Sequence, residues 1–374
     1  MGFGRFSFTG MYPVMVHDGL LTVSGGSLAA SSNYLGYLVG AVLLSRAHQR
    51  HAAVLSQVAM VGTILCLAAL CVDLGLTYIL AVRFFAGVFS ALAMIMATTW
   101  LFHGVGYHRG APVLFAGVGA GILASAELVA AAQGAGWSSA ASWGLLAGVA
   151  GLSCTYAWYR VRRQANLSIV SAADIDAPAP EGEESMSPPV MILLYGLAGF
   201  GYIVTATYLP LFIRHALGSA DPIQVWAAFG LGAVPSCFIW HALHRRLGSR
   251  RALILNLCVQ ASGVMLPVLS SSGPAFLASA VLVGGTFVGT VTIALSAART
   301  LAARVRYNIV AAMTAAYGIG QIAGPLVSDI LLSRTHTFVG PLVAAGGALL
   351  VALAACLLPR RALALPARQD SVMS

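Results

Sequence analysis

Apolar stretches of about 20 residues recur along nearly the whole chain, and this feature constrains the fold more than any other. Each stretch is long enough to cross the ~30 Å hydrocarbon core of a bilayer as a helix, which rises about 1.5 Å per residue. Charged residues make up 8% of the chain, whereas soluble domains carry roughly 25%. A stretch such as 52–72 also lacks the two-residue alternation of a membrane β-strand. The sequence therefore predicts an all-α membrane protein.

We expect twelve transmembrane helices in two pseudo-symmetric six-helix bundles. The predicted ranges are 1–16, 26–45, 52–72, 75–102, 111–133, 137–159, 189–213, 222–243, 252–271, 274–298, 308–331 and 338–358. The N-terminal bundle covers 1–159, and a charged, proline-containing cytoplasmic linker, predicted to be disordered, covers 160–188. The C-terminal bundle covers 189–359 and a cytoplasmic tail covers 360–374. The first helix is too short to span comfortably, which predicts that the chain starts downstream of the true start or is truncated.

The basic residues predict the orientation in the membrane. All of them are arginines, and with the N-terminus inside, 16 of the 20 fall on the cytoplasmic side. This asymmetry predicts a multi-pass protein of the bacterial inner membrane with both termini in the cytoplasm. Because these arginines lie in short loops between apolar runs, the net charge of +9 does not predict a nucleic-acid partner. The bilayer is the expected partner.

An internal repeat supports two related halves. The segment Gly2–Pro13 matches Gly199–Pro210 at an offset of 197, and Arg83–Gly87 matches Gly285–Gly289 at an offset of 202. Parallel repeats of this kind are typical of secondary transporters.

The helix pattern, charged linker and repeat resemble the major facilitator superfamily, and specific strings resemble its YbfB/YjiJ group. These strings are Gly4-Arg5-Phe6, Asn33-Tyr34-Leu35-Gly36-Tyr37, Gly199-Phe200-Gly201-Tyr202-Ile203, Thr205-Ala206-Thr207-Tyr208-Leu209-Pro210 and Met313-Thr314-Ala315-Ala316-Tyr317-Gly318 through Gln321 and Gly324-Pro325. The resemblance covers nearly the whole chain except the linker and tail. It implies two bundles around a central cavity and transport by alternating access, with no particular substrate.

This sequence departs from the superfamily pattern in both of the loops that carry a signature. Leu44 stands where the first loop signature has an aspartate, and Arg245 replaces the acid in the second half. The signature Arg-x-x-x-Gly-x-x-x-Ala is met by Arg83, Gly87 and Ala91. The resemblance implies that this arginine takes part in binding or coupling.

Three ionisable residues lie at membrane depth. Arg83 and Glu127 are both expected about 10 to 12 Å from the outer surface, where they can pair, and Arg5 lies near the midplane. Such residues are costly in a bilayer and are functional more often than not. We interpret the arginines as anion-binding or coupling groups and Glu127 as a proton acceptor, with a structural ion pair as the alternative. Asp329 is interpreted as a solvated helix cap near the outer surface.

Polar and aromatic side chains complete the expected site. They are Asn33, Tyr34, Tyr202, Thr205 and Gln321. A central pocket needs such groups to orient a ligand, although they also bond neighbouring helices. Tyr202 is favoured because it is the repeat partner of Arg5.

Pairs of glycines four residues apart predict close helix packing. They are Gly36 with Gly40, and Gly117 with Gly121.

The sequence thus predicts a secondary active transporter for a small organic solute. An anion is slightly favoured because of the two arginines, and a proton is the expected coupling ion. We expect no enzyme activity, no cofactor and no metal site, and no nucleotide-binding motif is present. Two alternatives stay open: a membrane sensor or scaffold without flux, and a proton-driven exporter of lipophilic compounds.

Overall fold

A computed structural model describes residues 1–44, 51–101, 110–164, 186–212, 222–302 and 305–357. The described residues are helical almost throughout. The elements are η1 (Gly2–Phe6), α1 (Ser7–His17), α2 (Val23–Leu44), α3 (Ala52–Ala69), α4 (Leu76–Thr99), α5 (Ala111–Gly134), α6 (Ser139–Gln164), α7 (Pro188–Phe212), α8 (Ile223–Leu269), α9 (Gly273–Ala302), α10 (Ile309–Thr335) and α11 (Val339–Leu357). The first of these is a π-helical turn that runs directly into α1. Most of the predicted linker, the predicted tail and several arginine-bearing loops lie outside the described residues.

Nine of the described helices are long and apolar enough to cross a membrane. The longest, α8, contains a break at Gly248, where a positive φ of 77° interrupts the helical backbone. Glycine adopts this conformation without the steric cost that a Cβ would add. The element therefore consists of two helices joined at a sharp bend, as the separate expected ranges 222–243 and 252–271 require. The protein is a multi-pass membrane protein.

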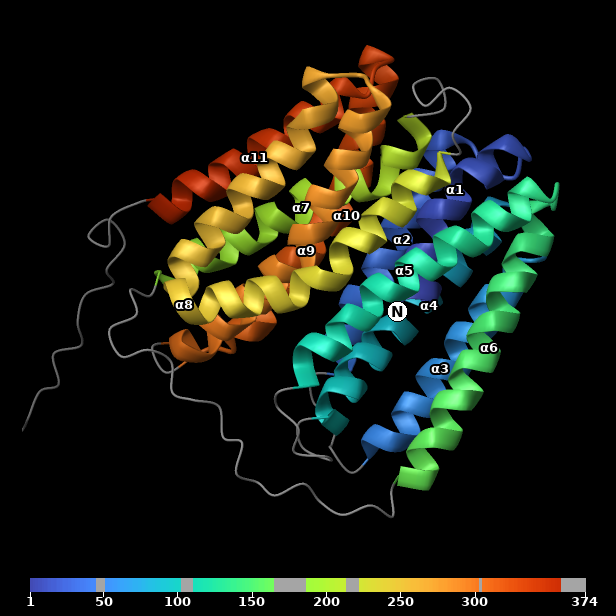
Figure 1. Cartoon of the computed structure of the whole chain (residues 1–374), viewed down its shortest axis with the longest axis horizontal. Coiled ribbons are helices and arrows are strands. Elements are labelled where there is room, and N and C mark those ends of the chain that lie inside the picture. The colour runs from blue at the N-terminus through green and yellow to red at the C-terminus, as the bar shows by residue number, and fades with distance from the viewer. Residues whose placement is uncertain (45–50, 102–109, 165–185, 213–221, 303–304, 358–374) are drawn as a thin grey trace, which may run out of the picture.

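The helices divide along the chain into two groups that lie side by side (Figure 1). We call η1 to α6 the N-terminal half and α7 to α11 the C-terminal half. Figure 1 shows α3 and α6 at one side of the molecule and α8 and α11 at the other. Between the halves, α1 contacts α7, α2 contacts α10, and α5 contacts α8. We call this boundary the seam.

Glycines bring helices of each half into backbone contact. A Cβ added at Gly36 of α2 would lie 1.9 Å from the carbonyl oxygen of Phe84 on α4. One added at Gly284 of α9 would lie 2.1 Å from the carbonyl oxygen of Phe229 on α8. Helices in a membrane associate through such small residues because the bilayer provides no hydrophobic force between them.

A related hydrogen bond occurs in each half beside these contacts. Asn33 Nδ2 donates to the carbonyl of Arg83 at 2.9 Å, and Trp240 Nε1 donates to the carbonyl of Gly285 at 2.6 Å. Arg83 and Gly285 are partners in the sequence repeat. In both halves, therefore, a side chain of the adjacent helix bonds the backbone at the same repeat position.

The expected glycine packing is confirmed at three of the four positions. Gly40 approaches Val88 and Ala91 of α4, and Gly121 of α5 lies against Gly2 of η1. Gly117 has no heavy atom within 4 Å of an added Cβ, so the close packing expected there is wrong. The residue is exposed on α5.

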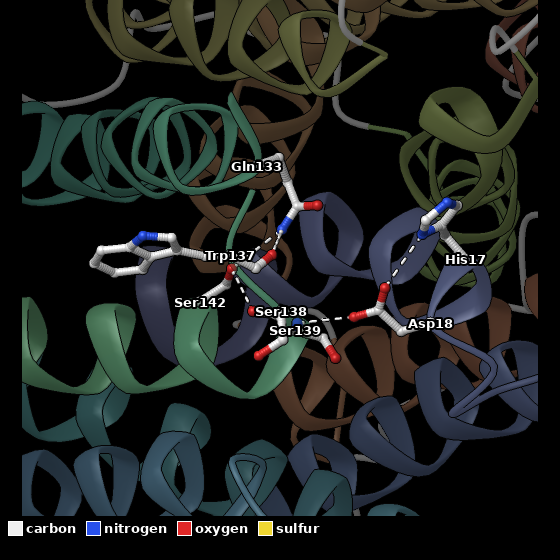
Figure 2. A network of polar contacts seen from close by, with 7 residues as sticks. All are labelled: His17, Asp18, Gln133, Trp137, Ser138, Ser139 and Ser142. Atoms are coloured by element: carbon white, nitrogen blue, oxygen red, sulfur yellow. Dashed lines mark hydrogen bonds and ion pairs between the residues drawn. The ribbon is translucent and has the colours of Figure 1, made fainter. Parts of the chain in front are cut away.

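A polar network joins the end of α1 to the start of α6 (Figure 2). The backbone N–H of Ser139 donates to Asp18 Oδ2 at 2.8 Å, and Asp18 Oδ1 lies 3.2 Å from His17 Nδ1. Gln133 Nε2 donates to the Trp137 carbonyl and to Ser142 Oγ, which fixes the turn before α6. Asp18 thus caps the N-terminus of a helix distant in sequence, where the helix dipole favours a negative charge.

We expect Asp18→Ala to destabilise the protein by about 1 kcal/mol at pH 7, as for the loss of a helix cap. Partial burial raises the pKa of Asp18, but the hydrogen bonds from Ser139 and the contact with His17 outweigh it, so the pKa lies below 3.8. A lowered carboxyl pKa contributes stability above pH 3.8 that is lost as the pH falls through the folded-state value.

The measurement is the melting temperature of wild type and variant between pH 7 and pH 3 in detergent. The difference between them is expected to shrink below about pH 4. The control is His17→Ala, which removes the contact with Asp18 Oδ1 and keeps the bond from Ser139 to Asp18 Oδ2. A difference that stayed constant across this range would contradict the capping role.

Candidate functional site

Arg5 lies at the seam and is held by a side chain of the opposite half. Its Nη2 donates to Gln321 Oε1 on α10 at 2.9 Å. Gln321 Nε2 in turn donates to the hydroxyl of Tyr202 on α7. Three residues predicted as site residues therefore form one hydrogen-bonded chain from η1 through α10 to α7.

Arg5 and Arg83 are both buried inside the protein. Their side chains are 5% and 2% exposed, and in the described part of the chain no carboxylate forms an ion pair with either. The Nε atom of each has no hydrogen-bond partner among the described residues. An arginine at the centre of a membrane helix costs about 3 kcal/mol on insertion scales, so two such charges need a compensating interaction.

Aromatic faces provide part of that compensation. The Arg5 guanidinium carbon lies 4.2 Å from the ring centre of Tyr37 and 5.0 Å from that of Tyr34. The Arg83 guanidinium carbon lies 4.2 Å from the ring centre of Phe8, and Arg83 Nη2 donates to the Arg5 carbonyl at 3.3 Å. A ring face attracts a cation through its quadrupole, but the attraction is weaker than that of a carboxylate. The two arginines thus keep unused capacity to bind an anion.

Two more predicted residues adjoin this group. Asn33 is fully buried on α2 and holds the backbone of Arg83 through the bond described above. Thr205 is fully buried on α7, three residues after Tyr202, and its hydroxyl has no partner among the described residues. A buried hydroxyl normally finds a partner, so each such group needs an explanation.

The expected pair between Arg83 and Glu127 is wrong. Glu127 is exposed on α5, and its Oε2 accepts a hydrogen bond from Gln224 of α8 at 3.5 Å. Arg83 is instead directed toward η1 and α1. The expectation relied on equal depth in the membrane, and depth does not specify the direction in which a side chain points from its helix.

Apolar rings around Arg5 were not among the predicted site residues. Phe6 lies 5.3 Å from the Arg5 guanidinium carbon, and Phe287 stacks on Tyr202 with ring centres 5.3 Å apart. The position of Phe6 next to Arg5 was the only available signal. No sequence signal identifies Phe287, because phenylalanine is as common at lipid-facing positions of membrane helices as it would be in a binding site.

A second set of polar contacts crosses the seam at the end where α2 begins. Ser24 donates to Asp329 Oδ2 of α10 at 2.8 Å, and Ser27 Oγ lies 2.6 Å from the hydroxyl of Tyr208 on α7. That hydroxyl also donates to the Pro325 carbonyl at 2.9 Å. We call these residues the α2 latch. Asp329 is therefore not the solvated cap that was expected, because α10 continues to Thr335 and Asp329 bonds the other half.

We expect Tyr208→Phe to loosen the α2 latch without unfolding the protein. The variant loses a hydroxyl that bonds both Ser27 and Pro325, and a net loss of about 1.5 kcal/mol raises the open population roughly tenfold. Hydrogen exchange of residues 18–30 in lipid nanodiscs measures this opening. The control is Tyr78→Phe, which removes only a bond to Ala69 within the N-terminal half. Equal exchange in the two variants would contradict the role of Tyr208 as a latch.

A pocket of about 410 Å³ lies away from Arg5, between the ends of α1, α3, α4 and α6. Asp18 and Asp73 line it, but each carboxylate already accepts a hydrogen bond from a nearby backbone N–H. The buried, under-bonded cations lie elsewhere, so we place the candidate site at Arg5.

Comparison with known families identifies the chain. The family described as "Uncharacterised MFS-type transporter YbfB" matches residues 1–357. The chain belongs to this family. It is therefore a membrane transporter of the major facilitator type and not an enzyme, and a transporter implies a small-molecule substrate. No curated protein matches the sequence.

The fold agrees with this assignment to the YbfB family. The crystal structure of the nucleoside transporter NupG superimposes with a TM-score of 0.66, covering 95% of this chain and 96% of NupG. The two sequences are 13% identical, so the likeness shows the major facilitator fold and nothing about the substrate.

Proposed function

We propose that this YbfB-family protein is a secondary active transporter of small organic anions, with Arg5 as the principal anion-binding group. One observation carries the proposal: two buried arginines have no carboxylate partner among the described residues, and both retain an unpartnered Nε. A buried cation that destabilises the folded protein is expected to have a function. The function that a guanidinium group favours is charge-assisted hydrogen bonding to an anion.

The bond between Arg5 and Gln321 suggests how binding and movement are linked. A neutral amide oxygen is a weaker acceptor than a carboxylate, so an incoming anion is expected to replace Gln321 Oε1 on the guanidinium. Replacement removes a direct link between the two halves. The halves are then free to rock about the bound anion, which is the motion that alternating access requires.

Arg83, Asn33, Tyr34, Tyr202 and Thr205 support Arg5 in this proposal. Arg83 adds positive charge and bonds the Arg5 backbone, while Asn33 positions Arg83. Tyr34 covers the guanidinium, and the Tyr202 hydroxyl holds Gln321. The Thr205 hydroxyl, which has no partner among the described residues, is available to the solute.

We further propose that the proton is the coupling ion and that Glu127 carries it. Glu127 is exposed at the contact of α5 with α8, so rocking of the halves would change its access to water.

We also propose twelve spanning helices in two bundles within the bacterial inner membrane, with both termini cytoplasmic. The two helices of α8 on either side of Gly248, and η1 continued by α1, support that count. The hydrogen bonds at the repeat partners Arg83 and Gly285 support the two-bundle division. The arginine asymmetry supports the orientation.

The test is a thermal-stability screen of the purified full-length protein against organic acids, amino acids, sugars and lipophilic cations at two pH values. A ligand stabilises the folded state by about RT ln(1 + [L]/Kd). We expect an organic anion to stabilise the wild type and to be taken up into proteoliposomes along a proton gradient.

Each other outcome rejects part of the proposal. Stabilisation by cations alone would reject anion transport and favour export of lipophilic compounds. Anion binding without flux would favour a sensor or scaffold. Anion flux that does not depend on the proton gradient, or that is unchanged in Glu127→Gln, would reject the coupling role of Glu127.

A further inference from the structure

The surroundings of Arg5 suggest a narrower class of anion than the proposed function names. On the N-terminal side, the rings of Phe6, Tyr34 and Tyr37 all lie within 5.3 Å of the guanidinium carbon, measured to their centres. Tyr34 and Phe6 are each 5% exposed, so these rings are shielded from solvent. The charge is held among flat apolar faces.

The C-terminal side of the seam presents rings as well. Tyr202 stacks on Phe287 with an interplanar angle of 16°, and on Tyr317 at 5.8 Å with an angle of 18°. Tyr195 continues the stack, 4.5 Å from Tyr317. The Tyr202 hydroxyl bonds Gln321, the residue that holds Arg5. The ring stack and the charge are thus parts of one connected structure.

Ring contacts also cross the seam. Phe6 lies 6.0 Å from Phe287 in an edge-on arrangement and 6.4 Å from Trp226, whose Nε1 donates to the Phe6 carbonyl at 3.1 Å. When the halves part, these rings lose their partners on the other side. Arg5 then lies between aromatic side chains of both halves.

We propose that the transported anion is an aromatic carboxylate. Its carboxylate replaces Gln321 Oε1 on Arg5, and its ring lies between Phe6 and Phe287, which meet edge-on across the seam. Contacts of the ligand ring with both of these side chains correspond to a preference of roughly tenfold over a saturated ring. This inference rests on the proposed function, because it needs Arg5 to bind the anion.

Three ligands of similar size test the inference on the wild-type protein. Benzoate has both ring and charge, cyclohexanecarboxylate has the charge without the aromatic ring, and benzamide has the ring without the charge. Dissociation constants come from thermal stabilisation and from quenching of tryptophan fluorescence, since Trp226 lies beside Phe6. We expect benzoate to bind about tenfold more tightly than cyclohexanecarboxylate, and benzamide to bind at least a hundredfold more weakly.

The outcomes separate the inference from the function on which it rests. Equal or tighter binding of cyclohexanecarboxylate, or binding only of other, non-aromatic anions, overturns the inference and leaves anion transport standing. Binding of benzamide as tightly as benzoate overturns both.

Two variants test whether the preference for an aromatic ligand arises at Phe287. Phe287→Leu is expected to reduce the tenfold ratio to about twofold, with little change for cyclohexanecarboxylate. The matched control is Phe85→Leu, which changes a ring of α4 that is 54% exposed and should keep the wild-type ratio. A full ratio in folded Phe287→Leu overturns the placement of the ring at Phe287. If that variant does not fold, the comparison of the three ligands on the wild type still decides the inference.

Discussion

Arg5→Gln is expected to weaken binding of the transported anion roughly a hundredfold while leaving the unliganded protein as stable as the wild type, or more stable. Loss of a buried charge partner costs about 2 to 5 kcal/mol of binding. The same substitution removes a cation that has no carboxylate partner among the described residues and that lies beside Arg83. Removing a buried charge that is only partly compensated also removes its desolvation cost from the folded state. The two effects therefore have opposite signs.

The opposite signs distinguish a functional from a structural arginine. The measurements are the melting temperature without ligand and the dissociation constant of the best anion from the screen. Arg334→Gln serves as the control, because Arg334 is exposed in the last turn of α10. Arg5→Lys should recover part of the binding, since lysine keeps the charge but not the planar fork that pairs with a carboxylate. A large fall in melting temperature with unchanged binding would show that Arg5 is structural.

Gly36→Ala is expected to lower the melting temperature by roughly 5 to 10 °C, or to prevent the folded protein from accumulating. The new Cβ would lie 1.9 Å from the Phe84 carbonyl, and this atom is backbone in the middle of α4, so it cannot rotate away. Separating α2 from α4 also stretches the bond from Asn33 to the Arg83 carbonyl. Overpacking of a tight core costs about 1 to 3 kcal/mol.

The chain offers a matched control for this prediction. Gly117→Ala adds the same methyl group to a glycine of α5 that has open space around it, so we expect no loss of stability. An alanine is also a better helix former than glycine in soluble hosts, which favours a neutral or positive effect. Equal melting temperatures for Gly36→Ala and Gly117→Ala would contradict the close contact of α2 with α4.

Much of the fold was predictable because its signals are local. The helix bounds follow from apolar length, and the bend in α8 follows from the polar segment around Gly248 between two apolar runs. Among the expected site residues, Arg5 was detectable because charges in apolar helices are rare, and Tyr202 because it occupies the repeat position of Arg5. The structure brings both together through Gln321.

The wrong predictions about the site concern the direction in which a side chain points from its helix, and not its depth in the membrane. Glu127 and Arg83 lie on α5 and α4, whose ends differ from the expected ranges by at most three residues. The rotation of each helix about its axis nevertheless directs the two side chains to different neighbours. Asp329 was assigned to water because its helix was expected to end at 331, and the structure continues that helix to Thr335. One sequence taken alone contains little information about helix rotation when a helix is apolar on all sides.

The sequence by itself determined that the chain forms membrane-spanning helices, since burial in a bilayer depends on the polarity of each residue and of its neighbours along the chain. It also determined which few side chains are too polar to face lipid. Only the tertiary structure decided what those side chains meet. Arg5 and Gln321 are 316 residues apart and belong to different halves, so their hydrogen bond exists only because η1 and α10 pack against each other across the seam.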